Sequence, residues 1–362
     1  MLHSMSLTDA SPDQHNSGHR SGAASTAWDA EERLLLVGWA TSKLHLQDHI
    51  TDRPPAHRQT PHLSGTAFAP QSREHTVTAT LTHNRHCRYR IFPLLTEHFT
   101  LVAPDLRGFG YTDKPPATDG YDSKTNAEDM ADLMTQLGHE HFYLHGEDRG
   151  ADYAYAVAGL YRDRVLKLSF CEMLLSGLGL EESSFWTPEN VTAQYRQQGV
   201  WCWVSHTIRP LVLSDRTDSC TQHLGFFYLP HIPEMLIAGH DREFWEVFIK
   251  QECYNPTSIE PKALNHWIDC VKQPGGLRGI LETYRSGFKN GELNQRLAKE
   301  KLTMPVMTIG APEFFGPKVR ECALEFAEDF DRSELFEECG HSIALEKPER
   351  LAKCLKEFML DS

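Results

Sequence analysis

The chain has 362 residues, of which 40% are hydrophobic, enough for one large domain or two smaller ones with a buried core. Its net charge of −14 at neutral pH, without a basic cluster, argues against nucleic acid or an anionic membrane as a partner. The nine cysteines are scattered singly, without the spacings that ligate zinc or build a secreted disulfide framework. We therefore expect a cytoplasmic protein with reduced thiols, no metal or other cofactor, and a small molecule as its binding partner.

The N-terminal quarter carries little structural signal. Residues 1–28 are rich in Ser, His, Asp and Gly and almost lack aliphatic side chains, so we expect a disordered tail. Residues 29–90 contain two candidate strands, at 31–39 and 75–82, separated by a patternless stretch rich in Pro and His. No segment has the layout of a signal peptide, and no apolar run approaches the roughly 18 to 20 residues of a membrane helix.

A regular alternation of strands and helices begins near residue 91. Short apolar runs predict the strands and amphipathic or Ala-rich segments predict the helices. The expected strands are 99–105, 141–145, 165–172, 304–310 and 333–340, and the expected helices are 123–138, 151–164, 319–330 and 342–360. Strands and helices in turn imply a parallel sheet with helices on both faces.

The alternation breaks between about residues 175 and 295. This block is rich in Trp, Phe and Tyr and predicts short helices at 242–252 and 261–272. A helical insertion between two strands of a parallel sheet lies over the C-terminal strand ends, where such sheets place their sites. We therefore expect a core built from residues 29–174 and 296–362, with the block between them as a helical cap.

The stretch GEDRG, residues 146–150, has the small-x-acid-x-small pattern of a nucleophile elbow between a predicted strand and helix. The alternative is that Asp148 only caps the following helix. His341 follows the last predicted strand, where an elbow enzyme has its base. Glu172 ends the strand after the elbow helix, where a carboxylate can orient an imidazole. The candidate nucleophile Asp148, acid Glu172 and base His341 then follow one another in this order along the chain.

Six stretches form an ordered set along the chain. They are DLRGFGYTDKP (105–115), HGEDRGA (145–151), the strand-end Glu172, PGGLRGILETYR (274–285), MPVMTIGAPEFFGP (304–317) and GHSIALEKPERLA (340–352). Together they resemble the α/β-hydrolase-fold enzymes of the epoxide hydrolase and haloacid dehalogenase branch, over roughly residues 88–360. The resemblance implies an α/β-hydrolase fold, a mostly parallel sheet with helices on both faces and an inserted helical cap.

The same resemblance implies that Asp148 is the nucleophile. Its carboxylate attacks a saturated carbon and forms an alkyl ester, which water activated by His341 and Glu172 then hydrolyses. Backbone N–H groups, including that of Arg149, hold the oxyanion of this step. Glu313 follows the next predicted strand and is the alternative acid.

Two substrate classes follow from the resemblance. An epoxide enzyme uses cap tyrosines as proton donors: Tyr284 matches the second, and Tyr195 and Tyr228 are candidates for the first. A haloacid enzyme holds its substrate carboxylate with arginines one and four positions after the nucleophile. Arg149 fits the first position, but Asp152 occupies the second and would repel the substrate.

The halide-binding His-Trp pair of the haloacid enzymes reads Cys202-Trp203 in this chain, so Trp203 is expected only to line the pocket. An apolar epoxide is therefore the favoured substrate. Hydrolysis of a haloacid or a haloalkane is the alternative.

The chain departs from the family pattern in two places. The His-Gly-x-Pro turn that supplies the second oxyanion donor is missing from residues 81–95, and residues 204–224 look like an insertion in the cap. Both departures would arise if the sequence had been translated across unspliced or misassigned exon boundaries. They also fit a divergent protein of weak or no activity, because one oxyanion donor contributes roughly 2.7 to 4 kcal/mol. The sequence does not set the oligomeric state, and a homodimer is compatible with it.

Overall fold

Six parallel strands form one sheet in the computed structural model, which describes residues 34–36, 89–116, 120–184, 222–328 and 330–361. The strands are β1 (Leu34–Leu36), β2 (Thr100–Val102), β3 (Phe142–Glu147), β4 (Val165–Cys171), β5 (Val306–Gly310) and β6 (Phe330–Leu335). They are hydrogen-bonded in the order β2-β1-β3-β4-β5-β6, and every pair is parallel. The predicted parallel sheet is confirmed.

The direction of winding reverses at β1. From β1 the chain moves outward to the edge strand β2, and it then returns to place β3 on the other side of β1. Parallel sheets leave a crevice at the C-terminal strand ends where such a reversal occurs, and ligands bind there. Asp148 directly follows β3 and therefore stands at this crevice.

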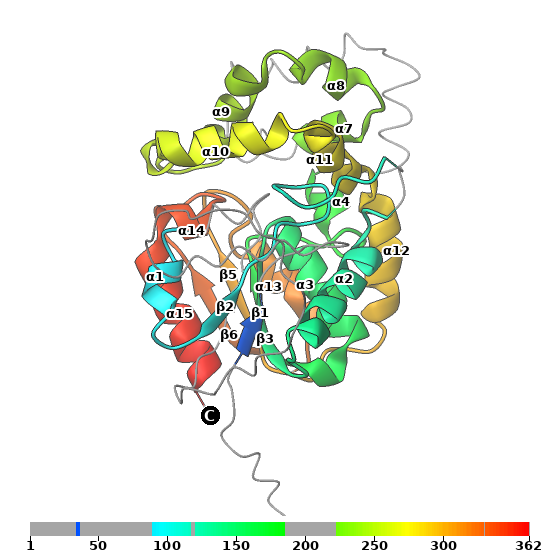
Figure 1. Ribbon diagram of the computed structural model, residues 1–362. Coiled ribbons are helices and arrows are strands. Elements are labelled where there is room, and N and C mark those ends of the chain that lie inside the picture. Colours follow the sequence, from blue (N-terminus) through cyan, green and yellow to red (C-terminus); the bar gives the residue numbers. More distant parts are fainter. Residues whose placement is uncertain (1–33, 37–88, 117–119, 185–221, 329, 362) are drawn as a thin grey trace, which may run out of the picture. The chain divides into compact units, whose positions relative to one another are not determined.

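Helices cover both faces of the sheet (Figure 1). One face carries α1 (Phe92–Leu95), α14 (Ile343–Glu346) and α15 (Pro348–Leu360). The other carries α2 (Ser123–Gln136), α3 (Arg149–Leu160), α12 (Gly287–Leu297) and α13 (Lys318–Phe326). The helix α3 is buried over almost its whole length, which explains why it consists mainly of small and apolar residues.

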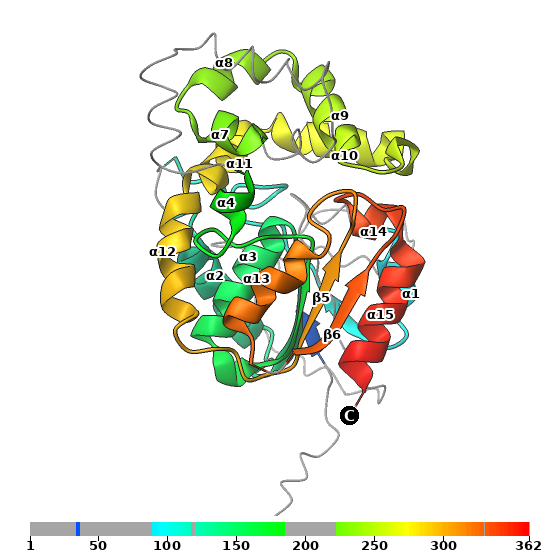
Figure 2. The same cartoon turned by 180° about the vertical axis from the view of Figure 1, so that it is seen from behind.

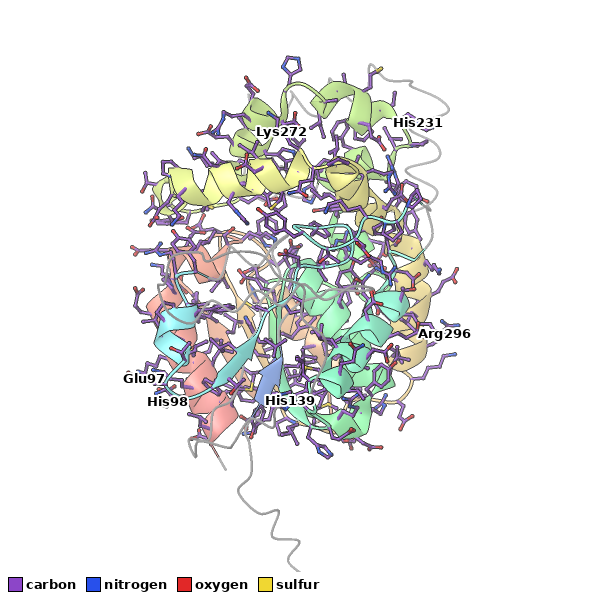
Figure 3. The ribbon with its side chains drawn as sticks, in the orientation of Figure 1. Glu97, His98, His139, His231, Lys272 and Arg296 are labelled. Carbon is purple, nitrogen blue, oxygen red and sulfur yellow. The ribbon has the colours of Figure 1, made fainter. Side chains whose placement is uncertain are left out.

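A helical layer lies over the C-terminal ends of the strands (Figure 2). It consists of α7 (Gln222–Tyr228), α8 (Ile232–Ile237), α9 (Asp241–Gln251), α10 (Pro261–Val271) and α11 (Gly276–Arg285). Its interior is aromatic: Trp245 is fully buried and packs edge to face against Phe248 and Trp267. Exposed charged residues such as Lys272 in this layer and Arg296 in α12 lie on the outside (Figure 3).

Within the block predicted as a cap, residues 175–295, the last helix behaves differently from the others. The helix α12 packs against α2 and α3, and so lies with the helices that cover the sheet. The short α4 (Leu180–Ser184) follows β4 at the start of the same block. None of the helices in the described ranges combines the length and the hydrophobicity needed to cross a membrane.

Several predicted boundaries shift in the structure. The helix predicted at 342–360 is divided into α14 and α15, because Pro348 disfavours helical geometry at Lys347, where φ is −133° and ψ is 51°. The strand and turn predicted together at 333–340 begin earlier, because β6 starts at Phe330, and the strand ends at Leu335. The helix predicted at 151–164 begins already at Arg149, directly after Asp148.

Other predictions fall outside the described residues. These are the tail at 1–28, most of the segment 29–90, including the strand at 75–82, and the cap residues Tyr195 and Trp203. Of the strand predicted at 31–39, Leu34–Leu36 forms β1. Of the insertion predicted at 204–224, only the last three residues are described, as the start of α7.

Candidate active site

Asp148 occupies a tight turn between β3 and α3. Its backbone has φ 54° and ψ −134°, a region that residues other than glycine rarely adopt. Its N–H donates to the carbonyl of Cys171 at 3.1 Å, and its carbonyl accepts from the N–H of Ala151 at 2.8 Å. The side chain makes no capping hydrogen bond, so Asp148 does not serve as the side-chain cap of α3. The turn instead has the form of the predicted elbow.

Gly146 allows the elbow to close. A Cβ atom at this position would lie 2.3 Å from the carbonyl oxygen of Gly150, which is far closer than van der Waals contact. Any larger residue would push β3 and the first turn of α3 apart. The small residues around Asp148 are therefore a steric requirement of the turn.

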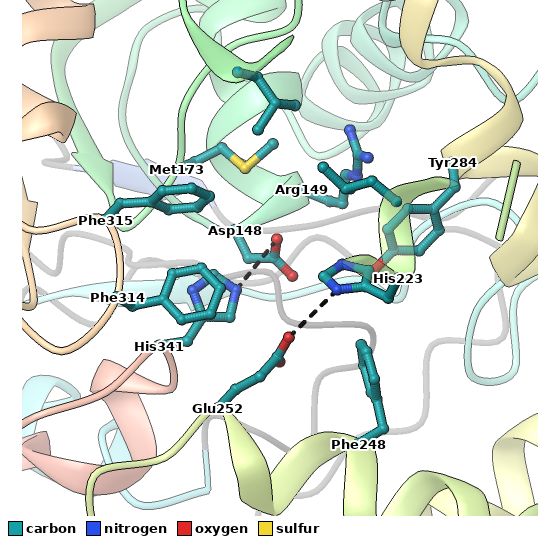
Figure 4. A pocket seen from close by; sticks show the side chains of 12 residues that line it. Asp148, Arg149, Met173, His223, Phe248, Glu252, Tyr284, Phe314, Phe315 and His341 are labelled. Atoms are coloured by element: carbon teal, nitrogen blue, oxygen red, sulfur yellow. Dashed lines mark ion pairs between the residues drawn. The ribbon is translucent and has the colours of Figure 1, made fainter. Parts of the chain in front are cut away.

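His341 lies beside Asp148, although almost two hundred residues separate them. Its Nε2 atom is 3.4 Å from Oδ1 of Asp148 (Figure 4), and its ring stacks on Phe314 with centroids 4.1 Å apart. Burial by itself would lower the pKa of His341. The negative charges of Asp148, Glu252 and Glu172 outweigh burial and raise this pKa to about 10. At neutral pH the structure therefore favours an imidazolium paired with the Asp148 carboxylate.

Glu172 is fully buried at the end of β4, also with positive φ (42°). Its carboxylate accepts hydrogen bonds from the N–H groups of Ala311, Phe315 (2.8 Å) and Gly316 (3.3 Å) in the loop after β5. Burial raises its pKa to about 8, against the opposing effects of His341 and of these hydrogen bonds. The same loop carries Phe314, so Glu172 fixes the wall on which the ring of His341 stacks.

Glu313, the alternative acid, lies in the same loop but is only half-buried and does not line the pocket around Asp148. Glu172 is fully buried and close enough to His341 to raise its pKa. The geometry therefore favours Glu172 over Glu313 as the acid.

Two adjoining hollows meet at Asp148, with volumes of about 360 and 500 Å³. Asp148, Phe248, Glu252 and His341 line both of them. The first is otherwise walled mainly by apolar side chains: Met173, Leu180, Leu224, Phe314 and Phe315. In the described residues, no group of three His, Cys, Asp or Glu side chains is arranged to hold a metal ion. The pocket therefore suits a small, largely apolar molecule.

Tyr284 and His223 lie together in the wall of the first hollow, which Asp148 also lines. Their rings are 5.5 Å apart and meet edge to face. Burial, and then the charge of Asp148, raise the pKa of Tyr284 well above its ordinary value, so Tyr284 keeps its proton. Tyr284 was predicted from the sequence, whereas His223 was not. It falls at the end of the stretch taken for an insertion, where no sequence pattern distinguishes it from the chain's other histidines.

Glu252 is a second pocket residue that the sequence did not indicate. It is the C-cap residue of α9, it is buried, and one carboxylate oxygen lies 3.7 Å from Nδ1 of His223 (Figure 4). Burial and the charge of Asp148 raise its pKa to about 8, although His341 acts in the opposite direction. Its carboxylate can be recognised as a pocket group only once α9 is packed over the strand ends.

The guanidinium group of Arg149 is buried in the pocket wall. It lies 4.6 Å from the ring centroid of Tyr284 and 3.7 Å from Oδ2 of Asp152. Asp152 in turn accepts hydrogen bonds from Asn290 and Asn294, both at 3.1 Å, and does not line either hollow. Asp152 therefore does not line the pocket, and it balances the charge of Arg149. Repulsion between Asp152 and a substrate carboxylate stays a prediction.

The two remaining predicted contacts are not part of this pocket as described. Tyr228 is half-buried and packs its ring against Phe288, with centroids 5.0 Å apart, on a side of α7 that does not line either hollow. Tyr228 is the last residue of α7, one turn beyond Leu224, and there it meets Phe288 of α12 instead of the pocket. Trp203 lies outside the described residues.

The parallel sheet, the acidic elbow and a histidine after the last strand define a hydrolase of the α/β class. In agreement with this, residues 79–268 match the α/β-hydrolase fold family. The chain belongs to that family, as the motif resemblance predicted.

The chain is similar to several known proteins. It is 28% identical over 263 residues to a soluble epoxide hydrolase of Corynebacterium sp. (strain C12), covering 72% of this chain and 80% of the relative. It is 36% identical over 102 residues to a fluoroacetate dehalogenase of Burkholderia sp., covering 27% and 34%. Among solved structures, Cfl2 from Burkholderia cenocepacia matches with a TM-score of 0.63 and 28% identity, covering 78% of this chain and 87% of that one.

Proposed function

We propose that this hydrolase opens epoxides to diols through an ester formed on Asp148. One observation carries the proposal: a single pocket contains the carboxylate of Asp148, the imidazole of His341 next to it, and two proton-bearing groups on Tyr284 and His223. A nucleophile, a base and proton donors are the groups that opening an epoxide and hydrolysing an ester require.

In the first step the carboxylate of Asp148 attacks one ring carbon of the epoxide. The carbon–oxygen bond breaks, its electron pair stays on the oxygen, and that oxygen takes a proton from Tyr284 or His223. An alkoxide is a poor leaving group without such a proton, so the donors are essential to this step. The product is a hydroxyalkyl ester of Asp148.

Esterification removes the charge of Asp148, the largest cause of the raised His341 pKa, so His341 first releases its own proton to solvent. In the second step the neutral His341 removes a proton from water, and the water oxygen attacks the ester carbonyl of Asp148. The backbone N–H of Arg149, at the start of α3, stabilises the oxyanion that forms. Collapse of this intermediate expels the alcohol, which takes the proton back from His341. Glu172 stabilises the charged imidazole while it holds that proton.

Two further observations support an epoxide as the substrate. The pocket wall is mainly apolar, and the charge of Arg149 is already balanced by Asp152. The similar soluble epoxide hydrolase of Corynebacterium covers most of the chain.

A haloacid is the second candidate substrate, and Arg149 is the observation that favours it. Within the described residues, both terminal nitrogens of its guanidinium are buried without a hydrogen-bond acceptor, and the side chain lines the pocket. A substrate carboxylate would supply such acceptors. The fluoroacetate dehalogenase of Burkholderia matches the chain over 102 residues.

The test is turnover of a panel of aryl and alkyl epoxides in water labelled with oxygen-18. We expect diol, and we expect mass spectrometry to find the label in the peptide that contains Asp148, because water oxygen enters its carboxylate at each ester hydrolysis. Asp148→Asn and Asp148→Ala should reduce the rate by about 10³-fold or more.

One control and two possible outcomes decide between the proposal and its second candidate. Enzyme kept in labelled water without substrate should stay unlabelled. Diol formation that survives in Asp148→Ala would contradict the mechanism. Halide release from haloacetates, with no diol from any epoxide, would replace the proposal with its second candidate.

A further inference from the structure

Glu252 is a buried carboxylate that the two proposed steps do not use. It is 8% exposed and lines both hollows that meet at Asp148. A buried carboxylate is unfavourable unless a partner compensates its charge. The burial of Glu252 in the pocket wall therefore indicates that its carboxylate has a function there.

The main chain and the side chain of Glu252 have different partners. Its carbonyl oxygen accepts a 2.8 Å hydrogen bond from the backbone N–H of His341, which ties α9 to the loop of the base. Its carboxylate faces the other way along the pocket, 3.7 Å from Nδ1 of His223 (Figure 4). A substitution that alters only the carboxylate therefore leaves the tie to His341 in place.

The other charged and polar groups in the pocket indicate which side chain is the partner of the Glu252 carboxylate. Asp148 and Arg149 face it from the elbow, Tyr284 from α11 and His341 from the loop after β6. Arg149 is paired with Asp152, and His341 is paired with Asp148.

His223 is the remaining basic group among those lining the first hollow. Carboxylates and imidazoles thus form two pairs, Asp148 with His341 and Glu252 with His223.

We propose that Glu252 is a positioning residue for ring opening, which keeps a proton on His223 so that His223 donates it to the oxygen released when Asp148 attacks. This inference rests on the proposed epoxide hydrolysis. Nδ1 of His223 lies 3.7 Å from Glu252, and the side chain of His223 lines the hollow that Asp148 also lines. Glu252 and His223 hold one proton between them, and the negative charge left on the pair after donation resides on Glu252.

The proton balance closes over the two steps. His223 gives its proton to the epoxide oxygen as the carbon–oxygen bond breaks. After ester hydrolysis Asp148 is released as a carboxylic acid, which loses its proton to solvent, and His223 and His341 each take one up. No oxidant, reductant or further reactant is needed.

The variant Glu252→Gln tests this role, because glutamine has nearly the same shape but cannot hold a charge. In single-turnover experiments we expect the rate of ring opening to fall about 10²-fold, the scale of lost acid catalysis. The rate of ester hydrolysis should change far less, because Glu252 makes only part of the contribution that raises the pKa of His341. The loss should be larger for an alkyl epoxide than for one with a trifluoromethyl group, whose alkoxide needs less help from a proton. The matched control Glu246→Gln, on the exposed side of α9 and paired with Lys250, should behave as wild type.

Two kinetic outcomes would overturn the inference. If Glu252→Gln slows ester hydrolysis and spares ring opening, Glu252 acts on His341 instead. If Glu252→Gln lowers the rates of both steps equally, and equally for both epoxides, Glu252 has only a structural role.

A second measurement does not depend on epoxide turnover. In nitrogen-15 spectra of the histidine side chains at pH 9, above the pKa of Glu252 (about 8), His223, assigned through His223→Gln, should be protonated in the wild type and neutral in Glu252→Gln. An identical spectrum in both proteins would sink the inference. Absence of diol from the wild type would instead count against the proposed function, with the spectrum still deciding the role of Glu252.

Discussion

Three main-chain N–H groups hold the carboxylate of Glu172, from Ala311, Phe315 and Gly316. Such a carboxylate cannot rotate to follow its partner, so the position of Glu172 is fixed by the loop after β5. Because that loop also carries Phe314, which stacks on His341, the negative charge and the imidazole are held by the same short segment. Glu172 therefore affects both the pKa and the orientation of His341, the proposed base.

At this residue scale, Glu172→Gln should slow ester hydrolysis by roughly 10²-fold and leave ring opening unchanged. The amide nitrogen of glutamine would face N–H donors, so we also expect a loss of about 1–3 kcal/mol in the free energy of unfolding. Rapid-quench detection of the ester and urea titration measure the two effects. Glu313→Gln is the matched control in the same loop, and a loss of ester hydrolysis in that variant instead would make Glu313 the acid.

At the scale of elements, the contact between α9 and the loop after β6 determines where the base stands. The backbone of Gly340 and His341 lies directly against the end of α9, and His341 donates its N–H to the carbonyl of Glu252. On the other side, Gly340 donates its N–H to the carboxylate of Glu346 at 2.9 Å. The helical layer is therefore part of the support of His341 as well as the cover of the pocket.

Gly340→Ala should break this contact. The added Cβ atom would lie 2.3 Å from the carbonyl oxygen of Glu252 and 2.6 Å from the nitrogen of Tyr254, so the loop and α9 must separate. We expect a loss of about 1–3 kcal/mol in the free energy of unfolding, as for other overpacked sites, together with slower ester hydrolysis, since His341 moves from Asp148. Glu337→Ala, an exposed position in the same loop, is the control and should change neither. Unchanged stability in Gly340→Ala would mean that this contact is not a tight one.

At the scale of the whole molecule, the ionisable groups buried between the sheet and the helical layer make stability depend on pH. The pKa of His341 is raised to about 10 by Asp148, Glu252 and Glu172, which outweigh burial. Its stabilising contribution is therefore complete below the ordinary histidine pKa near 6.5 and is lost as pH rises through 10. Burial raises the pKa of Glu172 and of Glu252 to about 8, so their contributions also fall as pH rises from about 4.5 to 8.

We therefore expect the free energy of unfolding to decrease between pH 5 and 10, measured by urea titration at a series of pH values. In Asp148→Asn the largest source of the raised His341 pKa is gone, so the decrease between about pH 6.5 and 10 should be smaller. Parallel curves for the two proteins would show that Asp148 and His341 do not form a charged pair in the folded state.

The sequence alone was enough to predict most strands and helices of the core, and it brought Asp148, His341, Glu172 and Tyr284 into one hypothesis. The elbow is a local feature, since the glycine at position 146 is required by its close approach to the backbone of Gly150, four positions further along the chain. Strand and helix periodicity is local in the same sense. Element ends shifted where a single residue, such as Pro348, outweighed the pattern.

The pocket wall, in contrast, was decided by the tertiary structure. His223 and Glu252 come from α7 and α9, and no spacing in the sequence relates them to each other or to Asp148. The hydrogen-bond partners of Asp152 likewise come from packing, because α12 brings Asn290 and Asn294 against it. Local sterics and periodicity therefore determined the turn at Asp148, whereas the packing of helices distant in sequence determined which polar groups face it.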